Sequence, residues 1–104
     1  MGVVVEDPLF QRINFVTTAA NGKLRELKLL LLQGDDPNSA DLSGNTALVM
    51  ASTNRHPEII ELLVKFGANI NCRDKNMMTP LLFVVNRGYM EIVRQLIDLG
   101  YMIE

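Results

Sequence analysis

The chain has 104 residues, of which 48% are hydrophobic and 21% are charged, a balance that predicts one folded domain and excludes a disordered polypeptide. The formal net charge of −2 gives nucleic acid or an anionic membrane no long-range attraction to the chain. Apolar runs are much shorter than the roughly 18 residues that cross a bilayer, and residues 3–5 are too few for a secretory signal. Because Cys72 is the only cysteine, a reducing intracellular compartment, cytoplasmic or nuclear, fits best.

The first predicted element is a helix that starts at Asp7 and Pro8. An aspartate side chain accepts hydrogen bonds from the unpaired N–H groups of a helix start, and proline is well tolerated in the first turn. Apolar residues follow at helical spacing: Leu9, Ile13, Val16 and Ala20. We interpret residues 1–12 as an N-terminal capping segment.

An internal repeat governs the rest of the chain. Gly34, Gly67 and Gly100 lie 33 residues apart. The same step aligns further residues: Thr46 with Thr79, Asp41 with Asp74, Glu58 with Glu91, Asn38 with Asn71, and Leu30 with Leu63 and Leu96. This agreement predicts three copies of one structural unit. They are residues 13–45, 46–78 and 79–104.

The middle unit is predicted to fold as helix, tight turn, helix and loop. Thr46 precedes a helix over residues 47–54, and Pro57 stands at the start of a second helix that ends before Gly67. A helical hairpin of this size cannot bury its apolar stripe alone. Neighbouring hairpins must therefore stack against each other.

The third unit repeats the pattern. The Thr79 hydroxyl is expected to cap a helix over residues 81–86, which Gly88 ends. A second helix over residues 90–99 carries its apolar residues on one side. We expect Gly100 to end that helix in the left-handed conformation.

Short segments of these units resemble a known family. Residues 44–48 (Gly-Asn-Thr-Ala-Leu) and 79–81 (Thr-Pro-Leu) resemble the ankyrin opening motif. Residues 56–63 resemble its second helix, and residues 67–71 (Gly-Ala-Asn-Ile-Asn) its closing turn. The chain from about residue 13 to residue 104 is therefore similar to ankyrin-repeat proteins. This resemblance implies an all-α solenoid of stacked helix-turn-helix units with projecting hairpin loops.

The two ends of the predicted stack differ. Glu26 stands where the later units have Ile59 and Ile92, and a polar residue there suits an end unit with no neighbour on that side. The third unit is more apolar than the second and carries Val84 and Val85 on its first helix. Repeat stacks need polar ends for solubility. The apolar end predicts a further repeat, self-association through this C-terminal face, or a partner that covers it.

Two expected glycines are replaced. Arg55 stands at the turn between the helices of the middle unit, where it costs roughly 1 kcal/mol if its backbone is left-handed. Met77 stands in the second hairpin loop at the position matched by Gly44.

No group of residues predicts catalysis or metal binding. His56 is the sole histidine, and the resemblance makes it a turn residue. Cys72 is interpreted as a structural loop thiol. Asp41 and Asp74 recur at the repeat step, which favours a structural role in each loop. We predict a non-enzymatic protein with neither a metal nor another cofactor.

The resemblance also implies where a protein partner binds. In ankyrin proteins the hairpin loops, or fingers, and the exposed side of the first helices line a concave surface that grips partners. The matching finger residues are Ala40, Leu42, Ser43 and Asn45, then Arg73, Lys75, Asn76 and Met78. The matching helix residues are Met50, Thr53 and Asn54, then Phe83, Asn86 and Arg87.

Two features favour contact at the second finger. Met77 and Met78 place flexible apolar side chains there, although Met77 packing on the neighbouring finger is an equal alternative. Arg73, Lys75 and Arg87 are expected to converge into a small basic patch. Such a patch favours a partner with an acidic segment.

The leading functional hypothesis is a protein–protein interaction module: an adaptor, a scaffold or a steric inhibitor. The alternative is a segment of a longer ankyrin solenoid, or a protein that self-associates through its C-terminal face. Neither reading involves nucleic acid or a membrane. The resemblance also makes Asn71 a candidate for hydroxylation, although such asparagines often brace the turn instead.

Overall fold

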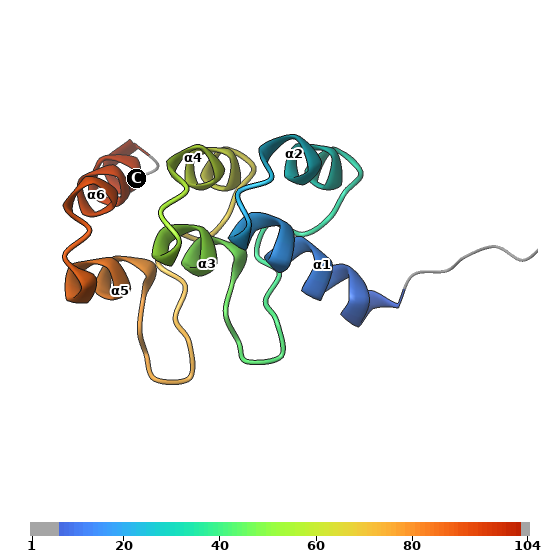
Figure 1. The fold of residues 1–104 in the computed structure, drawn as a ribbon, viewed down its shortest axis with the longest axis horizontal. Helices are drawn as coiled ribbons and strands as arrows, with labels where there is room; N and C mark the ends of the chain where they lie inside the picture. The colour runs from blue at the N-terminus through green and yellow to red at the C-terminus, as the bar shows by residue number, and fades with distance from the viewer. Residues whose placement is uncertain (1–6, 103–104) are drawn as a thin grey trace, which may run out of the picture.

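Stacked helical hairpins make up the described structure. A computed structural model of the chain describes residues 7–102, and the side-chain surroundings of residues 7–100. Over this part the chain is helical, without named strands, and its helices are α1 (Pro8–Ala20), α2 (Leu24–Leu32), α3 (Ala47–Thr53), α4 (Pro57–Lys65), α5 (Pro80–Arg87) and α6 (Met90–Met102). Figure 1 shows α1, α3 and α5 in one layer, α2, α4 and α6 in a second, and two long loops that project beyond the first layer. The predicted all-α solenoid is confirmed.

The first helix starts where the sequence predicts it. The backbone N–H of Leu9 donates to Asp7 Oδ1 at 3.1 Å, and Pro8 occupies the first turn. The helix runs without a break to Ala20, so residue 12 lies inside α1 rather than at its edge. Residues 1–6 of the predicted capping segment lie outside the described residues.

Threonine hydroxyls begin the first helices of the second and third units. Thr46 Oγ1 accepts from the N–H of Val49, and Thr79 Oγ1 accepts from the N–H of Leu82, both at 3.2 Å. Each bond satisfies a donor that a helix start leaves unpaired. α5 ends at Gly88 in the left-handed conformation, with φ 73°. The predicted cap at Thr79 and the predicted end at Gly88 are both confirmed.

The predicted helix end at Gly100 is wrong. Gly34 and Gly67 are left-handed, with φ 103° and 98°, and the residue after each bonds back to a carbonyl of the preceding helix. Gly100 instead lies within α6, which continues to Met102. Glycine inside a helix costs only about 1 kcal/mol, so it permits an end without imposing one. The shared spacing marks an equivalent position but does not determine its backbone conformation.

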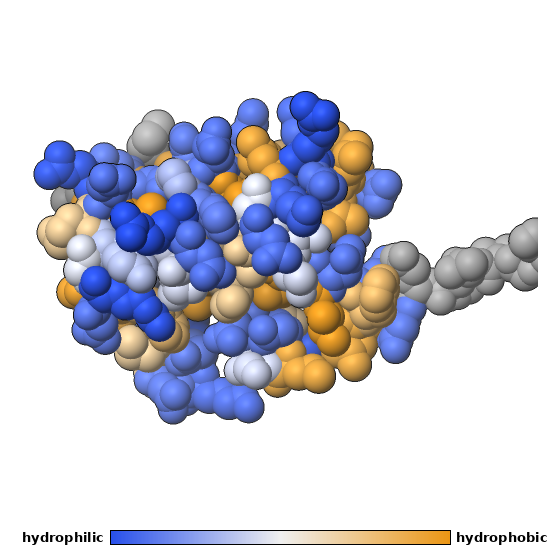
Figure 2. Space-filling view, viewed as in Figure 1, coloured by the Kyte–Doolittle hydropathy of each residue, from blue (hydrophilic) through white to orange (hydrophobic). Residues whose placement is uncertain are grey.

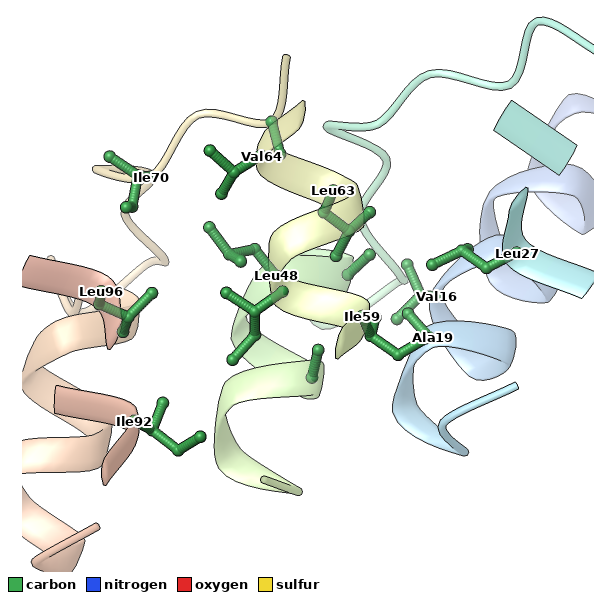
Figure 3. Close-up of a cluster of buried hydrophobic side chains, with 14 of the residues drawn as sticks. Val16, Ala19, Leu27, Leu48, Ile59, Leu63, Val64, Ile70, Ile92 and Leu96 are labelled. Carbon is green, nitrogen blue, oxygen red and sulfur yellow. The ribbon is translucent and has the colours of Figure 1, made fainter. Parts of the chain in front are cut away.

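A continuous apolar core joins neighbouring units. Figure 3 shows Ile59 of α4 beside Val16 and Ala19 of α1, and the Ile59 side chain is 1% exposed. Ile92 occupies the same position on α6 and is 4% exposed. Glu26, at this position on α2, is exposed to solvent. A polar residue is tolerated there because the described part of the chain has no hairpin in front of α2.

Polar contacts also connect the first and second units at their turns. The carbonyl oxygen of Ala20 accepts from Asn54 Nδ2 at 3.2 Å and lies 3.0 Å from His56 Nε2. His56 directly precedes α4, as expected for a turn residue. Gly22 has φ 71°, and a Cβ atom added there would lie 2.7 Å from Cε1 of His56. The close packing of the histidine ring therefore needs glycine at position 22.

We predict that Gly22→Ala lowers the free energy of unfolding by about 2 kcal/mol, because alanine adds left-handed backbone strain and meets the His56 ring. Urea denaturation measures this loss. His56→Ala removes the ring but leaves the strain, so the double variant should lose less stability than the sum of the single variants. Strictly additive losses would contradict the contact.

Candidate protein-binding surface

Two aspartates shape the fingers. Asp41 Oδ1 accepts backbone N–H bonds from Ser43 and Asn45, each at 2.9 Å. In the second finger, Asp74 Oδ1 accepts from the backbone N–H groups of residues 76 and 78, at 2.8 and 2.9 Å. One carboxylate thus closes each loop through two hydrogen bonds to its tip. The predicted structural role of the two aspartates is confirmed, and the fingers are preorganised loops.

The predicted finger residues lie on these loops. Leu42 is 69% exposed and Ser43 is exposed, whereas Ala40 and Asn45 are half-buried. In the second finger Arg73, Lys75 and Asn76 are exposed, and Met78 is half-buried. Figure 2 shows hydrophobic surface near α1 and the first finger, and hydrophilic surface at the second finger tip. The two fingers therefore offer different chemistry to a partner.

The predicted helix residues lie on α3 and α5 or at their ends. Met50, Thr53 and Phe83 are half-buried, and Asn54, Asn86 and Arg87 are exposed. The side chains of Asn54 and Thr53 also donate hydrogen bonds to backbone carbonyls. The Asn54 side chain bonds to the first unit through Ala20, and the Thr53 hydroxyl donates to the Met50 carbonyl at 3.3 Å.

Met77 combines an unusual backbone with an exposed side chain. Its φ is 64°, in the left-handed region that Gly44 occupies in the first finger with φ 85°. Its side chain is 59% exposed, so most of this apolar surface faces solvent. The loop thus carries backbone strain that glycine would relieve, together with a methionine suited to adaptable contact.

The three predicted basic residues lie on two different elements. Arg73 and Lys75 belong to the finger that precedes the helix, whereas Arg87 is its last residue, about 10 Å from Pro80 along the axis. The Arg87 guanidinium carbon lies 5.6 Å from the centre of the Phe83 ring. Positive charge therefore extends from the finger to the far end of the helix.

A further arginine was not among the predicted binding residues. Arg55 is left-handed, with φ 61°, which confirms the strained turn, and its guanidinium carbon lies 4.8 Å from the centre of the Tyr89 ring. Arg55 and Arg87 line one depression together with Tyr89 and Gln95. Gln95 Oε1 is buried there without a hydrogen-bond partner among the described residues. An arginine at a glycine position was the only sequence signal for this group.

Cys72 is a half-buried loop thiol. Its Sγ lies 3.3 Å from Thr46 Oγ1. Burial raises the pKa of the thiol and the Asp74 carboxylate adds to this rise, against the opposing effect of the Thr46 hydrogen bond. The reactive thiolate is therefore scarce at neutral pH, in agreement with the structural interpretation of this cysteine.

Asn71, the candidate for hydroxylation, is exposed. The equivalent residue of the first unit, Asn38, accepts from the Asn69 N–H at 2.7 Å and reaches the Gly67 carbonyl at 3.5 Å. No such side-chain bond connects Asn71 to another described residue. Hydroxylation at Asn71 stays a prediction.

Within residues 7–102, no three histidine, cysteine, aspartate or glutamate residues are grouped as metal ligands would be. No helix in this range is both long and apolar enough to cross a bilayer.

The fold and its two braced fingers define a repeat protein built from stacked helix-turn-helix units. The family pattern described as ankyrin repeats (3 copies) matches residues 15–104. The chain belongs to the ankyrin-repeat family.

Curated relatives share parts of this chain. An ankyrin repeat-containing protein of Schizosaccharomyces pombe is 35% identical over 82% of this chain and 40% of its own length. Protein phosphatase 1 regulatory subunit 27 of Mus musculus is 45% identical over 56% of this chain and 38% of its own length. Glycerophosphocholine phosphodiesterase gde1 of Schizosaccharomyces pombe is 43% identical over 68% of this chain but only 6% of its own length. The chain thus spans less than half the length of these relatives.

We predict that Met77→Gly raises the free energy of unfolding by about 0.5–1 kcal/mol, because it relieves a left-handed backbone at an exposed position. Met78→Gly is the matched control. Met78 does not have a positive φ, so glycine there should destabilise the loop. Equal effects of the two substitutions in thermal or urea denaturation would contradict the strain at residue 77.

We also predict that iodoacetamide modifies Cys72 in the folded chain more slowly than in urea at pH 7, because the folded pKa is raised. The raised pKa favours the folded state while the thiol is protonated. This contribution declines as the pH passes above the ordinary value of 9.0. Equal alkylation rates in the folded and unfolded chains would contradict the burial of the thiol.

Proposed function

We propose that the chain is a non-enzymatic protein–protein interaction module, acting as an adaptor, a scaffold or a steric inhibitor. Ankyrin repeats generally mediate protein–protein interaction, and their fold is non-catalytic. The observation that carries the proposal is the pair of aspartate-braced fingers beside α3 and α5, since preformed loops lose little conformational entropy when a partner binds. The fingers and the exposed side of α3 and α5 form the binding surface.

The second finger and α5 provide the contact for an acidic segment. Arg73, Lys75 and Arg87 are exposed, and so is Arg55 at the neighbouring turn. An extended partner segment of about three residues spans the roughly 10 Å length of α5. Carboxylates on a segment that also reaches the finger would meet Arg73 and Lys75 there and Arg87 at the end of the helix, which favours fast association and one binding register.

The half-buried Met78 and Phe83 supply the apolar part of the contact. A partner that covers them gains hydrophobic contact beside the charged residues, as at the centre of many interfaces. Phe83 already lies beneath the Arg87 guanidinium, so the aromatic ring and the charge are presented together. Exposed Leu42 extends the apolar contact onto the first finger.

The named relatives support a binding role more than a catalytic one. One is named as a regulatory subunit of protein phosphatase 1, a role exerted on another protein. The phosphodiesterase shares only its repeat region with this chain, which amounts to 6% of that protein. We therefore assign no hydrolytic activity to the chain.

The charge-reversed variant Arg73→Glu with Arg87→Glu tests the surface. Affinity capture with the intact chain as bait supplies the partner, and calorimetry with the purified partner measures its affinity. We expect at least a tenfold loss of affinity, about 1.4 kcal/mol, and a weaker dependence on salt.

Lys28→Glu with Lys65→Glu is the matched control. It changes the net charge by the same amount, at exposed positions on α2 and α4. This control should bind the partner with nearly unchanged affinity. Equal losses in the two variants would contradict a localised contact and indicate a general charge effect.

A further inference from the structure

The end of the stack formed by α5 and α6 presents apolar side chains to solvent. Leu82 and Val85 of α5 are 44% and 50% exposed, and Ile97 of α6 is 43% exposed. Met90 of α6 is 67% exposed and lines a shallow groove with Val93 and Ile97. We call Leu82, Val85 and Ile97 the end face.

Equivalent positions in the earlier units are buried. Val49 and Val16, one and two repeat steps before Leu82, are each 3% exposed. The counterparts of the other two side chains are equally covered: Ala19 and Ser52 are 0% exposed, and Leu31 and Val64 are 6% and 9% exposed. In each case the next hairpin covers them, because α3 packs on α1, α5 on α3, α4 on α2, and α6 on α4. The end face is therefore the same stacking surface without its neighbour.

We propose that the end face binds a further helical hairpin of the same repeat type, which goes beyond the proposed partner surface on the fingers. The packing between the existing units shows what kind of hairpin fits the end face. Ile59 and Ile92 are the residues that each incoming unit inserts at the junction, and both are almost fully buried. The added hairpin must therefore carry a branched apolar residue at this position of its second helix.

The first unit of a second copy does not meet this requirement. Its residue at the inserting position is Glu26. Head-to-tail stacking would bury that carboxylate against Leu82 and Val85, and an unpaired buried charge costs far more than the apolar contact returns. The occupant is a unit with isoleucine or valine at the inserting position.

A tandem extension of the intact chain tests this proposal. A second copy of residues 72–104 placed directly after Glu104 continues the 33-residue register and brings a second Ile92 to the junction. We expect the extended chain to unfold in one transition at a higher temperature than the original chain. Ile92→Glu in the added copy alone should abolish that increase.

Val85→Asp identifies the face that is used. In the original chain Val85 is half exposed, so the substitution should change the unfolding temperature little. In the extended chain it would bury a carboxylate and should lower the unfolding temperature by at least about 4–8 °C. Leu32→Asp is the matched control: Leu32 is also exposed in the last turn of its helix, and the equivalent residue of the third unit is Asp98. This control should change the unfolding temperature by the same amount in the original and the extended chain.

Three results would overturn the proposal. They are an unchanged unfolding temperature on extension, a separate transition for the added unit, and an equal effect of Val85→Asp in both chains. Light scattering on the original chain adds a fourth, a dimer that Val85→Asp dissociates, since a second copy would then occupy the face. The finger residues are unchanged throughout, so a failure here leaves the proposed partner surface untouched.

Discussion

The structure depends on one constraint, which is that a single helical hairpin cannot bury its own apolar side. Each hairpin of this chain becomes stable by packing against the next one, and Ile59 is central to the first junction because it enters the space beside Val16 and Ala19. Burying such a side chain is worth about 1.5–3 kcal/mol, which is large against the total stability of a small domain. The same constraint explains why Glu26 is tolerated only at the outer side of the first unit.

The two junctions satisfy this packing requirement with different side chains at the turn. At the first, the His56 ring lies against Gly22, and the missing Cβ of glycine provides the space. At the second, Tyr89 and Arg55 stand at the equivalent positions, and the arginine side chain lies over the aromatic ring instead. Cation–π contact offsets part of the strain of a left-handed arginine. The contact also holds the positive charge of Arg55 beside the depression that Arg55 and Arg87 both line.

The sequence predicted the features that depend on local chemistry. Three helix starts, at Asp7, Thr46 and Thr79, are determined by capping hydrogen bonds. Each of these bonds joins residues only two or three positions apart. The repeat register follows from spacing alone. Gly100 was predicted wrongly because the conformation of a glycine depends on the hydrogen bonds of the chain that follows it. The Arg55–Tyr89 contact could not be predicted, since it joins residues of different units whose distance only the stacking determines.

Stacking also determines what the surface can do. The fingers are closed by their own aspartates, so their shape does not depend on a partner, whereas their spacing is set by how the hairpins pack. An added hairpin on the end face would place a new first helix beside α5, next to the residues that carry the positive charge. The binding surface would then lengthen without altering the existing fingers, because each finger is closed by its own aspartate. Stacking at the end and recognition along the side are therefore compatible, and the first enlarges the surface available to the second.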